Sequence, residues 1–383
     1  MFRRKEFCAW SQTSDLRSDV FVRAETRPRR SGRPAAEGEY LMTNTFARAF
    51  ASIGAGLLLV LALAAASRQI TLPFGSWSRI SDTPIIAPQG DTFESAGTFN
   101  PTVVKYDGKF VMLYRAQDHQ GKSSLVYATS EDGIHFARRP QPVMVAEASY
   151  ENGGGVEDPR LVKIGDTFYL TYTGYNNQGG SGLHATGSIH GDAQLCMATS
   201  TDLLHWKRQS VIMPAYKGKW NVGWTKSGAI VPEKIDGKYW MYYLADGKHQ
   251  PTQMAIAYSN DLLHWTDVLD HPVLASRPRM FDSRVVEPGP APVVTDSGIL
   301  LIYNGADDNN VYRTGWVLFD KNDPTKVVGR AEQPIFEPLR DWEKVGQVPN
   351  VVFVEGLVPD GKRWLFYYGG ADKYVGVASA SAR

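Results

Sequence analysis

One phrase recurs along this chain, and its first copy reads Asp107-Gly108-Lys109-Phe110-Val111-Met112-Leu113-Tyr114. Each copy opens on a turn that contains glycine and continues as an aromatic-rich segment that ends at tyrosine. Glycine supplies the positive φ that hairpin turns need, and the residues after it favour extended backbone. Four further copies cover residues 165–172, 236–243, 297–303 and 360–368.

A second phrase follows three of these copies, at residues 127–136, 197–206 and 256–265, and reads as a strand, a polar turn and an aromatic that opens the next strand. The repeats are roughly 60 residues apart, and no stretch after the N-terminal leader has apolar periodicity of helix length. Four-stranded units at such a spacing are typical of β-propeller blades. The sequence therefore predicts an all-β fold, a five-bladed β-propeller running from about Ile80 to the C-terminus.

Histidine occupies one position of the second phrase in every copy, at His135, His205 and His264. A position that recurs once per repeat does not converge on one metal ion, so we interpret these as turn residues and expect no metal site. The glycines at 153–155 precede a strand-like run rather than a helix, which argues against a nucleotide site. We expect no redox cofactor either.

The N-terminal part differs in composition from the rest of the chain. Residues 1–41 are rich in arginine, and we expect them to be disordered. Residues 42–67 carry a basic start, an apolar run from Ile53 to Ala66 and small residues at its end, the pattern of a signal peptide. Met42 would then be the true start. An uncleaved membrane anchor through residues 49–66 is the alternative, because a span needs about 20 residues.

The domain at 68–383 would then be exported, either periplasmic or secreted. The whole chain has 41 Lys+Arg against 40 Asp+Glu, which gives no electrostatic reason to expect a nucleic-acid partner. Aromatic residues make up 11% of it, and flat rings suit sugar faces as well as cores. Only Cys8 and Cys196 occur, so no disulfide framework is expected and Cys196 is interpreted as a small buried hydrophobe.

The stretch from Gly153 to Arg160 combines three glycines, which let the backbone approach a ligand closely, with Glu157, Asp158 and Arg160. Charged groups beside strand-forming residues are costly to bury unless they are paired or do chemistry. An Asp158–Arg160 ion pair that only stabilises a turn is the alternative. In a propeller, however, the first strand of each blade lies toward the axis.

Polar residues on or beside these first strands are expected to converge on one end of the axis. Carboxylates in a polar funnel suit glycosidic-bond chemistry, which needs an acid to protonate the leaving oxygen. The expected set is Asn100, Arg115, Asp158, Arg160, Lys226, Glu287 and Asp372, of which Asn100, Arg115, Arg160, Lys226 and Asp372 are interpreted as substrate-binding residues.

These motifs resemble those of glycoside hydrolase family 130, the five-bladed mannoside phosphorylases and mannosidases. The resemblance runs from about Asn100 to Ala378 and is most specific at residues 99–101, 114–116, 155–160 and 231–239. Further matching segments are residues 287–292, 346–353 and 368–372.

The resemblance implies an inverting attack on a β-mannoside of an oligosaccharide, with Asp158 as the proton donor. In the phosphorylases of the family, the proton is thought to pass through a hydroxyl of the mannose, and inorganic phosphate is the nucleophile and co-substrate. Asn100 and Asp372 match positions that hold the mannosyl ring, and Arg115 matches a position near the phosphate.

Departures from the family pattern favour hydrolysis. Phosphorylases of the family follow the Gly-Lys-Tyr segment with a His-Arg pair that helps to bind phosphate, and here those positions read Tyr243-Leu244. Each lost charge-assisted hydrogen bond to phosphate is worth roughly 1.5–3 kcal/mol. Glu287 adds a carboxylate that would repel phosphate and could activate water as a base. Glu233 is the second candidate base, and Tyr243 is counted among the substrate-binding residues.

Three alternatives remain open beside the hydrolase. Arg115 and Lys226 stay basic, so a phosphate-dependent mannoside phosphorylase that releases mannose 1-phosphate is the first. A propeller that binds sugar without catalysis is the second. A five-bladed glycosidase of another class, acting on arabinan or fructan, is the third, although the contexts of Asp158 and Asp372 fit it less well.

Overall fold

A computed structural model describes residues 70–178, 192–215, 217–247 and 251–383. The predicted disordered leader and the predicted signal or anchor segment lie outside these described residues. Within the described ranges, no helix is long and apolar enough to cross a membrane. The described chain is nearly all β, as the repeated phrases predict.

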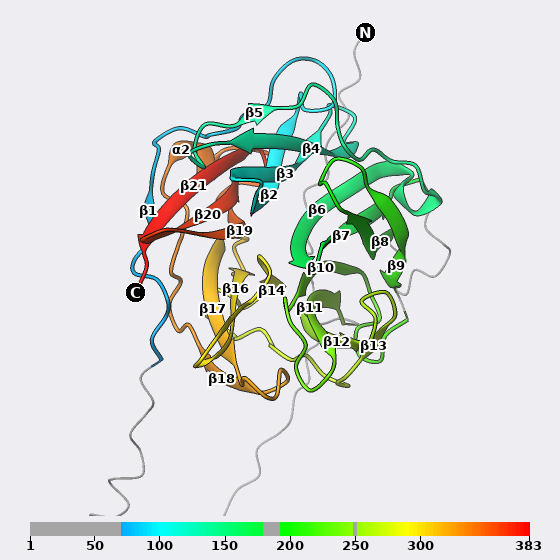
Figure 1. The fold of residues 1–383 in the computed structure, drawn as a ribbon, viewed down its shortest axis with the longest axis vertical. Helices are drawn as coiled ribbons and strands as arrows, with labels where there is room; N and C mark the ends of the chain where they lie inside the picture. The colour runs from blue at the N-terminus through cyan, green and yellow to red at the C-terminus, as the bar shows by residue number, and fades with distance from the viewer. Residues whose placement is uncertain (1–69, 179–191, 216, 248–250) are drawn as a thin grey trace, which may run out of the picture. The chain divides into compact units, whose positions relative to one another are not determined.

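Antiparallel units of strands follow one another along the described chain and lie around a common centre (Figure 1). Unit one holds β2 (Gly97–Tyr106), β3 (Lys109–Gln117), β4 (Ser123–Ser130) and β5 (Ala137–Arg138). Unit two holds β6 (Gly153–Ile164), β7 (Thr167–Asn176), β8 (Asp192–Ser200) and β9 (Lys207–Met213). Unit three holds β10 (Thr225–Ile230), β11 (Tyr239–Asp246), β12 (Thr252–Ser259) and β13 (Trp265–Asp267).

The last two units are built in the same way. Unit four holds β14 (Val285–Pro288), β15 (Val293–Thr295), β16 (Gly298–Ala306), β17 (Tyr312–Phe319) and β18 (Val327–Arg330). Unit five holds β19 (Val352–Asp360), β20 (Arg363–Gly370), β21 (Tyr374–Ser381) and β1 (Ser78–Arg79). Two short helices complete the described elements, η1 (Ser149–Glu151) and α2 (Asp341–Lys344).

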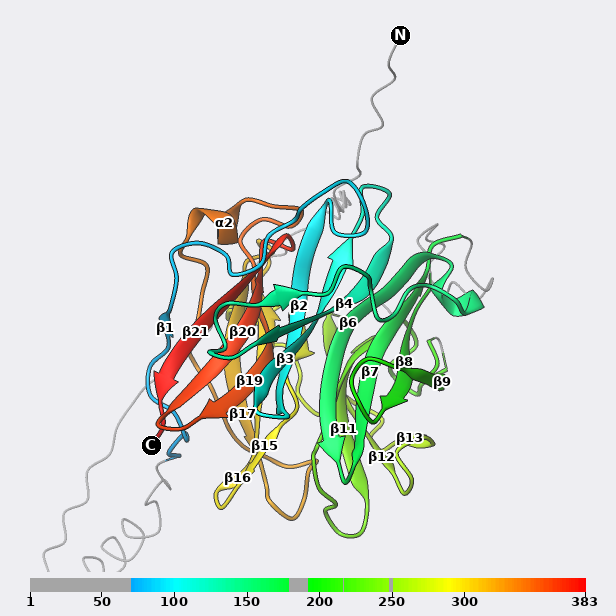
Figure 2. The ribbon, with the colours of Figure 1, turned by 45° about the horizontal axis from the view of Figure 1, so that its top comes forward.

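The N-terminal strand of the described chain completes the last unit. β1 pairs antiparallel with β21, with Ser78 opposite Ser379, and runs along its edge in both views (Figures 1 and 2). β19 of unit five in turn lies against β2 of unit one. The first and last units are therefore neighbours, and the chain closes on itself.

Each hydrophobic cluster of the core lies between two neighbouring units. Successive side chains of a strand point to opposite faces. On β3, Val111 and Leu113 accordingly pack into the cluster shared with unit two, whereas Met112 and Tyr114 pack into the cluster shared with unit five. Both faces of the middle strands are buried, which explains why the repeated phrase is a continuous apolar run rather than an alternating one.

The tyrosine that ends each repeated phrase belongs to this core. Its hydroxyl donates a hydrogen bond to a carboxylate held by a neighbouring segment. The pairs are Tyr114–Glu94, Tyr172–Glu151, Tyr243–Asp267, Tyr303–Asp282 and Tyr368–Glu343. An arginine pairs with the same carboxylate in units one, two, four and five: Arg138, Arg208, Arg277 and Arg79 respectively. A buried hydroxyl needs such a partner, because an unsatisfied polar group is costly.

The repeated histidines lie in exposed turns, as their shared repeat position predicts. His135 Nδ1 lies 2.7 Å from Asp132 Oδ2, and His205 and His264 make the same contact with Asp202 and Asp261. Cys196 is buried and free, in agreement with its interpretation as a core residue.

Candidate active site

A polar residue followed by proline or glycine marks the first strand of every unit. The five pairs are Asn100-Pro101, Asp158-Pro159, Ser227-Gly228, Glu287-Pro288 and Glu355-Gly356. On β2, β6, β10 and β19 the strand register shifts at this pair, as in a β-bulge. Asn100, Asp158 and Ser227 have φ values of 49°, 51° and 60°, in the left-handed region. Such bulges re-aim side chains out of the regular ladder.

Three of these side chains, Asn100, Asp158 and Glu287, line one pocket with a volume of about 180 Å³. The pocket brings together six of the seven residues expected to converge: Asn100, Arg115, Asp158, Lys226, Glu287 and Asp372. The remaining lining residues are Tyr312, Val348, Val351 and Phe353. The lining therefore combines charged with aromatic and aliphatic side chains, which suits a sugar ring with its polar edge and apolar face.

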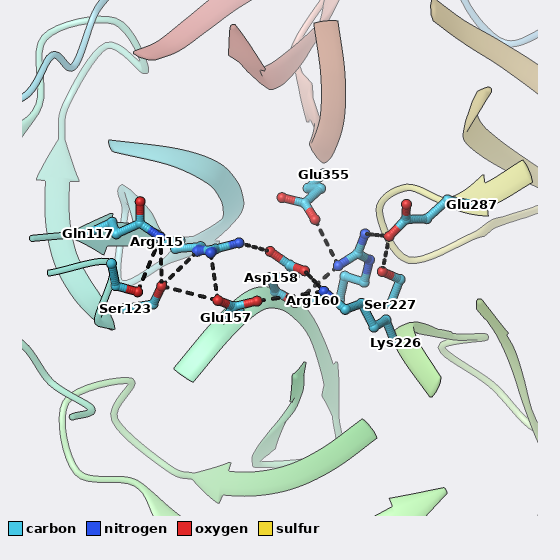
Figure 3. A network of polar contacts seen from close by, with 11 residues as sticks. Arg115, Gln117, Ser123, Glu157, Asp158, Arg160, Lys226, Ser227, Glu287 and Glu355 are labelled. Carbon is cyan, nitrogen blue, oxygen red and sulfur yellow. Dashed lines mark hydrogen bonds and ion pairs between the residues drawn. The ribbon is translucent and has the colours of Figure 1, made fainter. Parts of the chain in front are cut away.

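Two cations hold the acidic pair of β6 in place. Arg115 Nη1 lies 3.0 Å from Asp158 Oδ1, and its Nη2 lies 2.6 Å from Glu157 Oε1 (Figure 3). Lys226 Nζ lies 3.6 Å from Glu157 Oε2 and 3.8 Å from Asp158 Oδ2. Burial alone would raise the pKa of Asp158, but Arg115, Lys226 and Arg160 outweigh it and hold this pKa below its usual value. Asp158 is therefore ionised in the free protein at neutral pH.

Arg160 lies beneath the pocket rather than on its lining. It is buried, and its guanidinium donates hydrogen bonds to the backbone oxygens of Asp158, Pro288 and Gly289 at 3.0, 3.0 and 3.2 Å. Its Nη1 also lies 2.7 Å from Glu355 Oε1, and its Nη2 lies 3.8 Å from Glu287 Oε1. The prediction that Arg160 binds substrate directly does not fit this geometry, because protein groups already occupy its donors.

Glu287 faces the pocket from the far side of Arg160. Ser227 donates a hydrogen bond to its Oε1. Burial raises the pKa of Glu287 to about 7, against the opposing effects of Arg160 and Ser227. Burial likewise raises the pKa of Asp372 to about 6, although Arg115 opposes it. A carboxyl group with a pKa near 7 can gain or lose a proton readily at neutral pH, which is what acid–base catalysis needs.

Two of the predicted site residues lie elsewhere. Tyr243 is fully buried in the core between units two and three, where its hydroxyl donates to Asp267 and accepts from Asn221. It is the unit-three copy of the repeated core tyrosine, so its expected role in substrate binding is corrected here. Glu233 is exposed in the turn between β10 and β11. Lys226 lines the pocket from the start of β10, whereas Glu233 lies beyond the end of this strand and does not line the pocket, so its expected role as the base does not fit the structure.

Other residues of the site were missed by sequence reasoning. Glu355 carries the repeated polar position in unit five, and the signal that could have found it is the polar residue followed by Pro or Gly on each first strand. Ser227 shares that signal. Tyr312 and Phe353 carry no such mark, because aromatic residues are common on every strand of the core.

The described residues hold no group of three or more His, Cys, Asp or Glu side chains that could bind a metal ion. Among the carboxyl groups that line the pocket, Asp158 pairs with Arg115 and Lys226, and Glu287 pairs with Arg160.

Comparison with known proteins identifies the family. A family model described as beta-1,4-mannooligosaccharide phosphorylase matches residues 68–383. A 1,2-beta-oligomannan phosphorylase from Thermoanaerobacter sp. (strain X514) is 40% identical over 308 residues, which cover 78% of this chain and 95% of that protein.

Solved structures agree. One similar structure has a TM-score of 0.71 and 34% identity, and the match covers 82% of this chain and 98% of that one. Its description states that the GH130 family of mannoside phosphorylases contains glycoside hydrolases that target beta-1,2 mannosidic linkages in Candida mannan. The beta-1,2-mannobiose phosphorylase from Listeria innocua, in complex with beta-1,2-mannobiose, has a TM-score of 0.68 and 27% identity, covering 80% and 96%. The chain belongs to glycoside hydrolase family 130, as its motifs predict.

Proposed function

We propose that this protein is an inverting β-mannosidase that hydrolyses β-1,2-linked manno-oligosaccharides. One observation carries the choice of water over phosphate. The three cations at or beneath the pocket, Arg115, Lys226 and Arg160, each lie within 4 Å of a carboxylate of the protein.

Phosphate binding would require donors that are free of protein anions. In this site Arg115 and Lys226 are engaged by Glu157 and Asp158, and Glu287 and Asp372 add further carboxyl groups to the lining. A phosphate dianion entering the pocket would be repelled by the ionised Asp158 and would have to displace Asp158 and Glu157 from their cations. A neutral water molecule is not repelled by carboxylates and need not displace them.

The proposed reaction needs one proton on the Asp158–Glu287 pair. Asp158 protonates the oxygen that leaves, and Glu287 removes a proton from the water that attacks the anomeric carbon from the opposite face. In the free protein the order of pKa values places the shared proton on Glu287. A bound sugar excludes water from Asp158, which raises the pKa of this carboxyl and draws the proton toward it.

The relatives support the linkage, and the arrangement of units supports the architecture. The phosphorylase from Thermoanaerobacter and the hydrolases in the description of the solved structure are both named for β-1,2 linkages. We propose in addition that the five antiparallel units are the blades of a β-propeller, with the pocket at the mouth of its axis. Export, by a signal peptide within residues 42–67, is proposed from the sequence alone.

Phosphorolysis is the second candidate function. It is favoured by the names of the curated relatives, which are phosphorylases, and by the presence of Arg115 and Lys226 on the pocket wall.

The experiment that tests the proposal is product analysis with β-1,2-mannobiose in the presence and absence of inorganic phosphate. We expect free mannose without phosphate, and mannose 1-phosphate appearing only when phosphate is added would contradict hydrolysis. Glu287→Gln should lose activity and recover it with azide, giving α-mannosyl azide, because a nucleophilic anion needs no base. Asp158→Asn should keep activity only on aryl mannosides, whose leaving groups need no proton.

A further inference from the structure

Glu355 is a fully buried carboxyl group that the proposed reaction does not use. It lies at the bulge of β19, in the unit-five copy of the position that Asp158 occupies in unit two and Glu287 in unit four. It does not line the pocket, and its nearest described cation is Arg160, at 2.7 Å between Nη1 and Oε1. Burying a carboxyl group beside an active site is costly and calls for a reason.

Arg160 connects three units through its single guanidinium. Its Nη1 reaches the backbone oxygen of Asp158 and the side chain of Glu355, whereas its Nη2 reaches the backbone oxygen of Pro288 and approaches Glu287. In Figure 3 Glu355 and Glu287 lie on opposite sides of Arg160, with Asp158 next to it. One planar group thus holds the backbone at Asp158 and approaches the carboxyl group of Glu287, and its third side contacts Glu355.

We propose that Glu355 is a positioning residue that, through Arg160, fixes Asp158 and Glu287 at the separation that the reaction needs. The inference rests on the proposed roles of these two residues and adds a third carboxyl group that never touches the sugar. Without the Glu355 contact, the backbone oxygens of Asp158, Pro288 and Gly289, in units two and four, still anchor the guanidinium. The Glu355 carboxyl group then no longer fixes its tilt toward Glu287 from the side of unit five.

The protonation of Glu355 suits this role. Burial raises the pKa of Glu355 to about 8, despite the opposing effects of Arg160 and Asn100. At neutral pH the side chain is therefore mainly uncharged, and it contacts Arg160 through Oε1, which lies 2.7 Å from Nη1. The length of the side chain, rather than its charge, then determines its contact with Arg160, and glutamine has the same length.

The test compares Glu355→Gln with Glu355→Asp in steady-state kinetics on β-1,2-mannobiose, assayed both with and without phosphate. Glu355→Asp keeps the acid but shortens the side chain by one methylene, and we expect kcat to fall about 10–100-fold with little change in KM. Glu355→Gln should recover most of kcat. Glu343→Gln is the matched control, because Glu343 is equally buried and pairs with Arg79 away from the pocket. It should lower the unfolding temperature and leave kcat unchanged.

Each other outcome overturns the inference. If Glu355→Asp kept the wild-type kcat, Glu355 would be a structural residue only. If kcat were lower in Glu355→Gln than in Glu355→Asp, the charge of Glu355 rather than its length would be the relevant property. Because turnover is measured with water and with phosphate, an error about the nucleophile does not affect this result.

A readout that needs no turnover is the NMR signal of the Arg160 Nε–H group, assigned by its loss in Arg160→Lys. A guanidinium held in place protects this proton from exchange with water. The signal should persist in Glu355→Gln and broaden in Glu355→Asp, and equal signals in both variants would overturn the inference.

Discussion

Arg115 and Asp158 form an ion pair inside the pocket, with Nη1 3.0 Å from Oδ1. The same guanidinium also contacts Glu157, and its Cζ lies over the ring of Phe99, 4.6 Å from the ring centroid. The cation that the family resemblance places near phosphate is therefore committed to the protein's own carboxylates. We infer that this pairing disfavours phosphate, because a phosphate ion would have to compete with Asp158 and Glu157 for Arg115.

Asp158→Asn is accordingly expected to bind inorganic phosphate more tightly than the wild-type protein. Removing the charge of Asp158 leaves Glu157 as the remaining carboxylate that pairs with Arg115 and Lys226, so each cation can turn toward phosphate. A charge-assisted hydrogen bond of about 1.5–3 kcal/mol corresponds to roughly a 10–100-fold gain in affinity. Calorimetric titration with phosphate measures it directly, with the exposed and distant Glu233→Gln as the control. Tight binding to the wild-type protein that Asp158→Asn does not improve would show that the cations are already available.

The pH dependence of kcat/KM should report the proton shared by Asp158 and Glu287. Glu287, with its pKa raised to about 7, loses that proton as the pH rises, and the doubly ionised pair has no acid left. We therefore expect kcat/KM to fall above about pH 7 and to hold a plateau below it. On the acid side the decline should come only below the usual aspartate range, because the pKa of Asp158 is lowered. A rise through pH 7 would contradict the assignment.

The fold could be predicted because its signal is repeated five times. Each glycine turn and each tyrosine-ending strand recurs with the spacing of a unit, so errors in single elements do not accumulate. The closing contact between β1 and β21 could not be predicted, because Ser78 and Arg79 carry no strand pattern of their own. It depends on the position of β21, which is a tertiary effect.

Site residues were predicted where a polar residue stands next to a proline, and they were missed where they lie within an apolar or aromatic run. Asp158, Glu287 and Asn100 stand out beside prolines, whereas Glu355 sits in an apolar run and Phe353 is one aromatic among many. Tyr243 was misassigned because its substitution for a family residue was interpreted without reference to the repeat, which makes it a core tyrosine. The glycine at 155 was expected to approach a ligand, but it approaches the Ser123 carbonyl, which would lie 2.1 Å from an added Cβ.

Tyr243→Phe tests this correction. Removing the hydroxyl takes a donor from Asp267 and an acceptor from Asn221 and leaves only the bond between these two side chains, which should cost about 1–3 kcal/mol in the free energy of unfolding. Because the ring stays in the core, kcat/KM should not change. Chemical denaturation and steady-state kinetics on the same preparation provide both numbers, and a loss of kcat/KM at unchanged stability would restore Tyr243 to the substrate site.

Glu287→Gln should make the protein more stable at alkaline pH, because the folded protein disfavours ionised Glu287. The pKa of this carboxyl is raised from 4.5 to about 7 by burial, so the folded state retains a proton that the unfolded chain gives up. Stability from this group is full below about pH 4.5 and is lost as the pH rises to about 7. A shift of this size corresponds to about 3 kcal/mol at most.

Glutamine does not titrate, so the unfolding temperature of Glu287→Gln relative to the wild type should be higher at pH 8.5 than at pH 5. Scanning calorimetry at the two pH values measures that difference, with Glu233→Gln as the exposed control. A difference that does not depend on pH would mean that Glu287 titrates in its ordinary range, and the proposed base would then lack the tuning that the pocket gives it.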